Sequence, residues 1–361
     1  MMSTLKISLL VMAFALTSKT AFAQVDSNFH IFLLFGQSNM AGGGAISDSA
    51  PDCDTTPRVK VMSFADCNAG PDCKSYVMKR THDQWYTAFP PLHDCSASLE
   101  GICPGDWFGK TMIDSVRSDI SIGLVPCALS GMALNVFLKG SSATSTVGPP
   151  QVKGQNAYNW MLNRCKLAQQ KGVIKGILLH QGESGTGTSQ AWDAMAMQIF
   201  SDLKTDLSLG AKTTMIVGQL RSDNTSPSQN NTSFNTLIAG MSAKYSNTGY
   251  ASSQGLVGNG RDVWHFNPSS MREIGKRYAR ALLSLSDATF IPRKNSVGIV
   301  TKQLKAASND ALKILIKDGE TYDLNGRQKK LDDSKGQSQN TENFYLLRGI
   351  NGSQTQLIEL K

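Results

Sequence analysis

The sequence predicts an α/β fold in which a mostly parallel sheet is covered by helices on both faces. Two observations support this fold: short apolar runs alternate with longer segments of helical periodicity, and polar clusters follow several of the apolar runs. Strands that alternate with helices form βαβ units, and these units place the loops after each strand at one edge, where such folds bind ligands.

Apolar runs of strand length recur up to Val257, and each is expected to be a buried strand. The expected strands are Phe29–Phe35, Val59–Ser63, Ile120–Leu129, Val173–His180 and Thr213–Leu220, with a sixth ending at Gly255–Val257. Segments with apolar residues at helical spacing fall between these runs. The expected helices are Asp106–Val116, Asn156–Gln170, Ser189–Leu207, Phe234–Tyr245 and Pro268–Leu283.

Residues 1–23 are expected to be a secretory signal peptide. Lys6 supplies positive charge, Ile7–Leu16 form a short apolar core, and small residues precede Gln24. The apolar run is shorter than the roughly 20 residues that span a bilayer, and no later segment is apolar enough to do so. We therefore expect a bacterial protein without a membrane span that is secreted or held at the cell surface.

The chain changes character after Phe290, which divides it into a large domain, residues 24–290, and a small C-terminal β module, residues 291–361. The module lacks long helical periods and is rich in Lys, Asn, Gln and Ser. Asn325-Gly326 is a hairpin-turn signal within it. Short strand-like runs recur at Ala311–Ile316, Phe344–Arg348 and Thr355–Leu360.

The net charge of +8 is dispersed along the chain, whereas nucleic-acid binding requires a concentrated basic stripe with aromatics. We therefore expect no nucleic-acid partner.

The seven cysteines are compatible with disulfides in an exported protein. Cys67 with Cys73, and Cys95 with Cys103, are close enough to close small loops, but spacing does not define connectivity, and the odd count leaves at least one thiol. Cys127 lies in an apolar strand and is expected to be a buried free thiol. No Cys/His grouping has zinc-ligand spacing, so no metal is expected.

Two polar segments carry the residue types of nucleophilic catalysis. Gly36–Met40 directly follows the first expected strand, so Ser38 would project from a tight strand-to-helix turn. Asp262–His265 precedes the last expected helix. A serine hydroxyl needs a base within hydrogen-bond reach, and the base needs an orienting acid. Taken singly, each segment also has a plain reading as a helix cap or packing residue.

Two further polar segments end expected strands. His180–Ser184 ends the fourth strand, and the Gln181 amide is a candidate donor to the oxyanion of a tetrahedral intermediate. Leu129–Ala133 ends the third strand, and the Gly131 N–H is a second candidate donor. The alternative readings are a structural network that ties the loops together and a plain strand-to-loop bend.

Together these segments resemble the SGNH hydrolase superfamily, because Ser, Gly, Gln, Asp and His appear in that chain order at one expected sheet edge. More narrowly, Gly36–Met40, His180–Glu183 and Asp262–His265 resemble carbohydrate esterase family 6, the acetyl xylan esterases, and the related sialate O-acetylesterase group. The likeness spans about residues 28–285. It implies a three-layer α/β/α, flavodoxin-like fold.

The resemblance also implies roles for individual residues. The implied catalytic triad is Ser38, His265 and Asp262, and the implied oxyanion hole is formed by the N–H groups of Ser38 and Gly131 and the side chain of Gln181. Glu183 is an accessory acid that is an alternative partner for His265. We favour Asp262, because its short spacing from the histidine fixes its reach.

Five residues near the expected site are candidate substrate contacts. Gln37 and Asn39 flank the serine, Trp264 lies between the acid and the base, and Trp85 and Trp107 lie near the expected active edge. Aromatic faces stack on sugar rings, although core packing is the alternative for each tryptophan.

We therefore expect a secreted serine esterase that removes O-acetyl groups from plant polysaccharide through an acetyl-Ser38 intermediate, without a cofactor. Acetylated xylan is the leading expected substrate, and sialate or other glycan esters are the alternative. A non-catalytic carbohydrate-binding protein on a hydrolase scaffold is disfavoured by the complete Ser, His, Asp and Gln set. The C-terminal module resembles terminal modules of exported polysaccharide-degrading enzymes, which implies cell-surface attachment, sorting or carbohydrate binding.

Overall fold

The computed structural model divides the chain into two compact units, Met1–Lys294 and Asn295–Lys361. It describes residues 24–43, 51–68, 73, 79–95, 101–184, 189–223 and 231–294, together with five short strands of the second unit. The expected signal peptide lies outside the described residues. In the described part of the chain, no helix combines the length and apolar character needed to cross a membrane.

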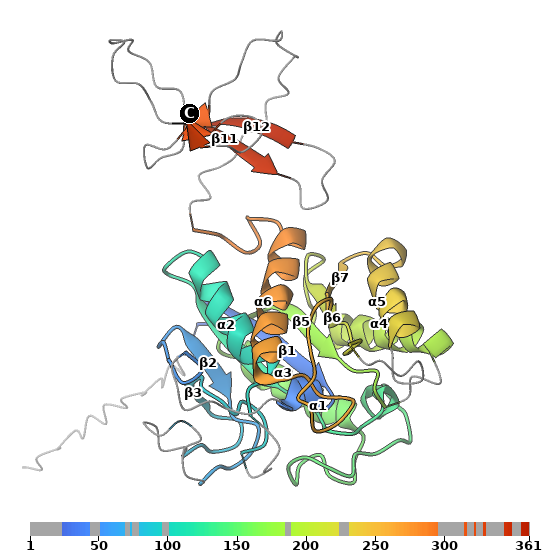
Figure 1. The fold of residues 1–361 in the computed structure, drawn as a ribbon. Helices are drawn as coiled ribbons and strands as arrows, with labels where there is room; N and C mark the ends of the chain where they lie inside the picture. The colour runs from blue at the N-terminus through green and yellow to red at the C-terminus, as the bar shows by residue number, and fades with distance from the viewer. Residues whose placement is uncertain are drawn as a thin grey trace, which may run out of the picture. The chain divides into compact units, whose positions relative to one another are not determined.

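A seven-stranded sheet forms the centre of the first unit (Figure 1), which confirms the expected α/β fold. The strand order is β3-β2-β4-β1-β5-β6-β7, and only β3 runs antiparallel to its neighbour. The strands are β1 (Phe29–Gly36), β2 (Val59–Met62), β3 (Trp85–Thr87), β4 (Ser121–Pro126), β5 (Val173–His180), β6 (Thr214–Gly218) and β7 (Thr248–Ala251).

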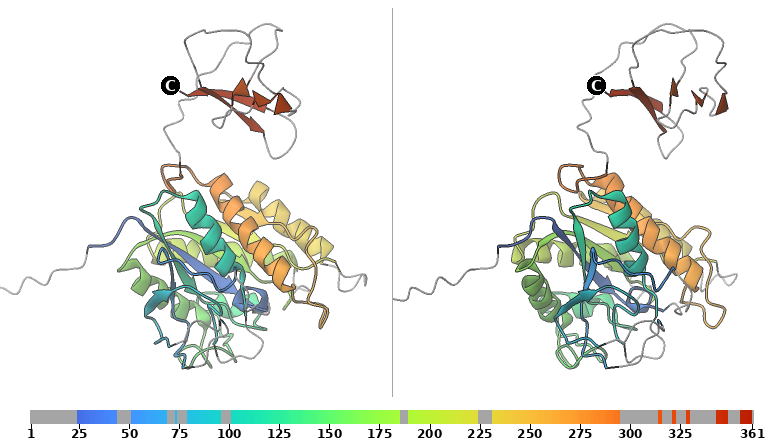
Figure 2. Two further views of the ribbon diagram at one scale, coloured as in Figure 1. Left: turned by 60° about the vertical axis from the view of Figure 1, so that its left-hand side comes forward. Right: turned by 90° about the vertical axis from the view of Figure 1, so that its left-hand side faces the viewer.

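Helices cover both faces of this sheet. Figures 1 and 2 show α2 and α6 side by side on one face, and buried side chains of α3, α4 and α5 pack against the other. The helices are α1 (Ser38–Ala41), α2 (Pro104–Ser115), α3 (Ala157–Gln169), α4 (Ser189–Asp206), α5 (Thr232–Lys244) and α6 (Pro268–Leu285), with a short 3₁₀ turn, η1 (Leu134–Phe137).

The central strand β1 is buried on both faces. Ile31, Leu33 and Phe35 point into the core beneath α3, α4 and α5, whereas Phe32 and Leu34 point into the core beneath α2 and α6. A parallel strand with helices on both sides is expected to be a continuous apolar run, because neither face meets water. This packing fixes the register of β1 and therefore the position of the turn that follows it.

Two strands differ from the sequence-based expectation. The last strand is Thr248–Ala251, and Gly255–Val257 is a loop whose Leu256 is buried in the core. β3 lies in a cysteine-rich stretch that was expected to be loop, and its three residues are too few to give a strand signal.

The disulfides join Cys53 to Cys73 and Cys67 to Cys95. The short pairings that spacing suggested are therefore wrong. Cys67 and Cys73 each bond to another cysteine, and Cys103 is a buried free thiol at the start of α2. Cys127 is a buried free thiol, as expected.

The second unit contains two small antiparallel sheets. One has the order β10-β9-β8 and the other pairs β11 with β12. β9 and β10 flank the expected Asn325-Gly326 turn, whose own residues lie outside the described ones. The strands are β8 (Ile314–Leu315), β9 (Thr321–Tyr322), β10 (Gln328–Lys329), β11 (Asn343–Arg348) and β12 (Thr355–Leu360).

His93 is a buried titratable group in the first unit. Neither of its ring nitrogens has a hydrogen-bond partner among the described residues. Burial, and next the charge of Arg164, lower the pKa of His93 from 6.5 to about 3. The unfolded chain therefore takes up a proton near pH 6.5 that the folded protein accepts only near pH 3. Stability falls as the pH drops through this window, by about 1.4 kcal/mol per pH unit.

We predict that His93→Phe makes the protein less sensitive to acid. The loss in free energy of unfolding between about pH 7 and about pH 4 should be smaller than in the wild type by about 3 kcal/mol, because one proton-linked group has been removed. Urea denaturation at both pH values measures this difference. Equal losses in the two proteins would show that His93 is not held neutral.

Candidate active site

Ser38 begins α1 immediately after β1. Gly36 has a φ of +133°, and a Cβ at this position would lie 2.0 Å from the backbone oxygen of His180 at the end of β5. The N–H of Gln37 donates to the same oxygen at 2.9 Å. Only glycine permits this approach. The close contact between the paired ends of β1 and β5 therefore positions Ser38.

Ser38, His265 and Asp262 form a continuous hydrogen-bonded relay. The Ser38 Oγ lies 2.8 Å from His265 Nε2, and His265 Nδ1 lies 2.9 Å from Asp262 Oδ2. The structure therefore brings together three residues from two distant segments. A hydroxyl donating to an imidazole that is oriented by a carboxylate is the arrangement that activates serine as a nucleophile.

The loop that carries the acid and the base is held by its own side chains. Asn259 Oδ1 accepts the N–H groups of Arg261 and Asp262, and its Nδ2 donates to Asp262 Oδ2 at 3.0 Å. Asp262 Oδ1 accepts the N–H groups of Trp264 and His265, each at 2.8 Å.

These contacts determine the charge of Asp262. Partial burial raises its pKa, but hydrogen bonds from the side chains of Asn259 and His265 and from two backbone N–H groups together hold the pKa well below its ordinary value. The carboxylate therefore remains ionised while it orients the imidazole.

Asn39 connects the nucleophile to this loop. Its Nδ2 donates to the Trp264 carbonyl at 3.1 Å and to Glu183 Oε1 at 2.5 Å, and its Oδ1 accepts the Phe266 N–H at 3.3 Å. The backbone is thus held on both sides of His265. Asn39 is fully buried and its amide is engaged, so its contacts hold the backbone around His265, and a substrate contact by Asn39 stays a prediction.

Glu183 lies beneath the relay. Its carboxylate contacts Asn39 and lies 3.7 Å from His180 Nε2. Burial raises the pKa of Glu183, although the Asn39 amide lowers it, and burial lowers the pKa of His180 to about 3. Of the two acids considered for His265, Asp262 makes the ring contact.

Gln181 and Gln37 form a buried amide network. Gln181 Nε2 donates to Gln37 Oε1, the Ser184 carbonyl and the Met132 carbonyl, at 3.1, 2.8 and 3.3 Å. Trp192 Nε1 donates to Gln181 Oε1. The Gln181 amide is therefore engaged with protein oxygens, and donation to an oxyanion would require one of them to be released. Gln37 is likewise buried, and its Oε1 accepts hydrogen bonds from the loop after β5.

The loop after β4 lies beside the nucleophile. The Leu129 N–H donates to the Gly36 carbonyl at 2.9 Å. Gly131 follows two residues later with a φ of +75°, is exposed, and accepts Ser184 Oγ on its carbonyl at 3.0 Å. The first N–H groups of a helix have no acceptor within it, although those of Met40 and Ala41 in α1 donate to the Gln37 carbonyl at 2.8 and 2.9 Å.

The three candidate tryptophans have different environments. Trp85 packs edge to face on Phe29 with a centroid separation of 4.9 Å, and Trp107 Nε1 donates to Asp52 at 3.0 Å. Both are partly buried, which agrees with the packing interpretation. Trp264 is 39% exposed beside the base.

Sequence reasoning missed an ion pair behind the catalytic loop. Arg221 donates to the Asp262 carbonyl at 2.6 Å and pairs with Asp223, which accepts the Gly258 N–H at 3.0 Å. Only weak sequence signals pointed to the residues that support this loop. Arg221 follows an expected strand, and Asn259, which contacts Asp262, begins an Asn-Gly pair. Within the described ranges, no group of three or more His, Cys, Asp and Glu side chains is arranged to hold a metal ion.

Comparison with solved structures supports the fold. The chain superposes on a structure of a protein from Arabidopsis thaliana with a TM-score of 0.53 and 23% identity, covering 72% of this chain and 99% of that one. It superposes on NanS with a TM-score of 0.54 and 14% identity, covering 72% and 98%. At these identities the likeness establishes architecture alone.

Sequence comparison establishes the family. A probable carbohydrate esterase of Arabidopsis thaliana is 31% identical over 162 residues, which are 43% of this chain and 54% of that protein. The match thus spans about half the length of that relative. A family model described as carbohydrate esterase, sialic acid-specific acetylesterase, matches residues 28–284, which contain Ser38, Asp262 and His265. The chain therefore belongs to this family of carbohydrate esterases.

Proposed function

We propose that this protein is a serine esterase that removes O-acetyl groups from a carbohydrate. The observation that carries the proposal is the relay from Ser38 through His265 to Asp262, with contacts of 2.8 and 2.9 Å. Family membership supports the substrate class. Carbohydrate binding alone does not require an aligned serine, histidine and aspartate, so the relay favours an enzyme over a non-catalytic binding protein.

In the first step, His265 Nε2 accepts the Ser38 proton as Oγ attacks the acetyl carbonyl carbon. The tetrahedral intermediate places its negative charge at the N–H groups of Ser38 and Gly131, which we propose as oxyanion donors. The intermediate collapses as the C–O bond to the sugar breaks, and His265 gives the proton to the departing sugar oxygen. Acetyl-Ser38 remains.

In the second step, water replaces the sugar. His265 takes a proton from water, the resulting hydroxide attacks the acetyl-Ser38 carbonyl, and the intermediate releases acetate as the proton returns to Ser38. Asp262 remains ionised throughout and stabilises the imidazolium that forms in each half of the reaction.

Acetylated plant polysaccharide, with acetylated xylan first, remains the proposed substrate. It rests on the resemblance of three segments to acetyl xylan esterases. A second candidate, an O-acetylated sialic acid, is favoured by the description of the matching family. Acetate release from both substrates under the same conditions distinguishes them. Export and surface attachment through residues 295–361 are further proposals, with which the two disulfides are compatible.

We predict that Ser38→Ala reduces acetate release from the preferred substrate by at least about 10⁴-fold, because the nucleophile is lost. Ser242→Ala, on an exposed face of α5, is the matched control and should retain full activity. Equal release by wild type and Ser38→Ala would rule out the acetyl-serine mechanism.

We predict different outcomes for the two acids near the base. Asp262→Asn should lower kcat by about 10⁴-fold, because the amide no longer fixes the imidazole tautomer. Glu183→Gln should lower kcat by less than about tenfold, because it keeps a hydrogen-bonding oxygen for Asn39. Steady-state kinetics at neutral pH tests both, with thermal unfolding as the folding control. A larger loss for Glu183→Gln would reverse the assignment.

We predict that Gly43→Ala impairs catalysis without removing a functional group. A Cβ on Gly43 would lie 2.6 Å from His265 Cδ2, so the imidazole must shift. A displacement of about 1 Å costs on the order of 10²-fold in rate. Gly240→Ala is the control, because an added Cβ there would meet no atom from outside the surrounding turns of α5 within 4 Å. Unchanged kcat in Gly43→Ala would show that the ring tolerates displacement.

A further inference from the structure

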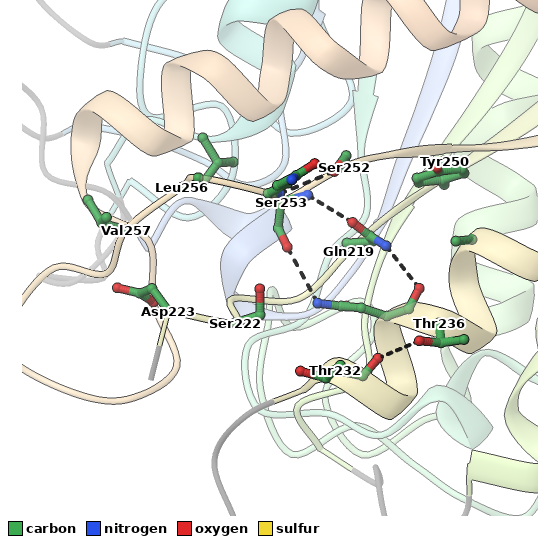
Figure 3. A pocket seen from close by; sticks show the side chains of 14 residues that line it. Gln219, Ser222, Asp223, Thr232, Thr236, Tyr250, Ser252, Ser253, Leu256 and Val257 are labelled. Atoms are coloured by element: carbon green, nitrogen blue, oxygen red, sulfur yellow. Dashed lines mark hydrogen bonds between the residues drawn. The ribbon is translucent and has the colours of Figure 1, made fainter. Parts of the chain in front are cut away.

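A pocket of about 500 Å³ lies next to the catalytic loop (Figure 3). Its walls come from the chain after β6, from α5, and from β7 with the loop that follows it. Its volume falls in the range of about 300–1,000 Å³ that small-molecule sites occupy. None of the expected site residues lines it, so the relay does not account for it.

Most of the residues that line this pocket have polar, uncharged side chains. Hydroxyl and amide side chains predominate, and Tyr250 supplies an aromatic ring. The one charged lining residue is Asp223, which is paired with Arg221, and no lysine or arginine lines the pocket. This surface suits a neutral polyhydroxy ligand, and an anionic ligand would meet a carboxylate without a lining cation.

Hydrogen bonds between lining residues hold the walls of the pocket in place. Gln219 Nε2 donates to the Asn235 carbonyl at 2.9 Å, and Gln219 Oε1 accepts the Ser253 N–H at 3.1 Å, as Figure 3 shows. Asn235 Nδ2 also donates to Ser253 Oγ at 3.4 Å. Binding would therefore cost little ordering of these side chains.

One wall of the pocket is formed by a loop whose backbone pairs with the segment that follows His265. Val257 lines the pocket and accepts the Asn267 N–H at 3.1 Å, and the next residue, Gly258, pairs with Phe266. Asn267 follows His265 by two residues, and two extended residues span about 7 Å. The loop that lines the pocket is thus paired with the segment that carries His265, and this adjacency is the basis for placing a bound sugar next to the relay.

Exposed apolar side chains recur on the chain segment that joins the pocket to the base. The described residues include six exposed large hydrophobic side chains, and three of them, Tyr250, Val257 and Trp264, lie on one short segment. Trp264 stands beside the base, whereas Tyr250 and Val257 line the pocket. Tyrosine and tryptophan present an apolar face with a polar edge, which is the surface that a sugar ring needs.

We propose that the pocket lined by Tyr250 and Val257 is a subsite for a neutral sugar residue of the same glycan chain whose acetyl ester reaches Ser38. The proposal rests on the proposed esterase function and adds a substrate class to it: a neutral oligosaccharide that extends beyond the acetylated residue. An acetylated sialic acid, which carries a carboxylate, does not gain from this subsite.

The test compares pocket variants on three esters. Tyr250→Ala removes the ring, Tyr250→Phe keeps it, and Thr236→Trp fills the pocket from the exposed face of α5. Leu167→Ala removes an exposed apolar side chain from α3 as the matched control. The esters are para-nitrophenyl acetate, a partially acetylated xylo-oligosaccharide and an O-acetylated sialic acid.

We expect the ratio of kcat/KM for the oligosaccharide to that for para-nitrophenyl acetate to fall by about three- to tenfold in Tyr250→Ala and Thr236→Trp, mainly through KM. The ratio should be unchanged in Leu167→Ala, and it should fall less in Tyr250→Phe than in Tyr250→Ala, because phenylalanine keeps the ring face. Unchanged ratios in both pocket variants would overturn the subsite. An equal fall on the sialic acid ester would overturn its preference for neutral sugars.

A binding measurement separates failure of the subsite from failure of the esterase function. Ser38→Ala protein is titrated with unacetylated xylo-oligosaccharide by calorimetry, with and without Tyr250→Ala. Binding that is weakened by Tyr250→Ala supports the subsite even if no ester is cleaved. Binding that is absent, or that is unaffected by Tyr250→Ala, overturns the subsite even if Ser38-dependent hydrolysis is present.

Discussion

The buried amide of Asn39 ties together two segments that are far apart in the sequence. It is adjacent to the nucleophile, and it bonds the backbone on both sides of the base. Leaving such a group unpaired in the interior costs about 1–3 kcal/mol, so the fold strongly favours the state in which all its bonds are made. In that state Ser38 Oγ lies 2.8 Å from His265 Nε2.

The rest of the site keeps this contact rigid. Asn259 folds the loop around the Asp262 carboxylate, and the Arg221–Asp223 pair holds the same loop from behind. Gln37, Gln181 and the end of β5 fix the other side. A site assembled before the substrate arrives loses little free energy to reorganisation during the reaction. Most polar side chains around the relay are therefore engaged with other groups of the protein.

Much of this arrangement could be predicted from local sequence. The apolar run of β1 indicated a buried strand, and Gly36, two residues before Ser38, indicated a tight turn at its end. The three-residue spacing of Asp262 and His265 correctly indicated a contact that the backbone alone nearly imposes. Short elements without periodicity were missed, including β3, and the disulfide partners were set by spatial neighbours that sequence spacing does not reveal.

The sequence by itself determined the α/β architecture, the strand that presents the serine, and the acid–base pair, because each depends on residues within one strand, turn or loop. Only the tertiary structure decided the roles of Gln37, Asn39 and Gln181, which lie at the sheet edge but are buried with their amides engaged. An amide has the same chemistry whether it faces solvent or the interior. Whether the amide is exposed or buried depends on the residues that distant parts of the chain place around it.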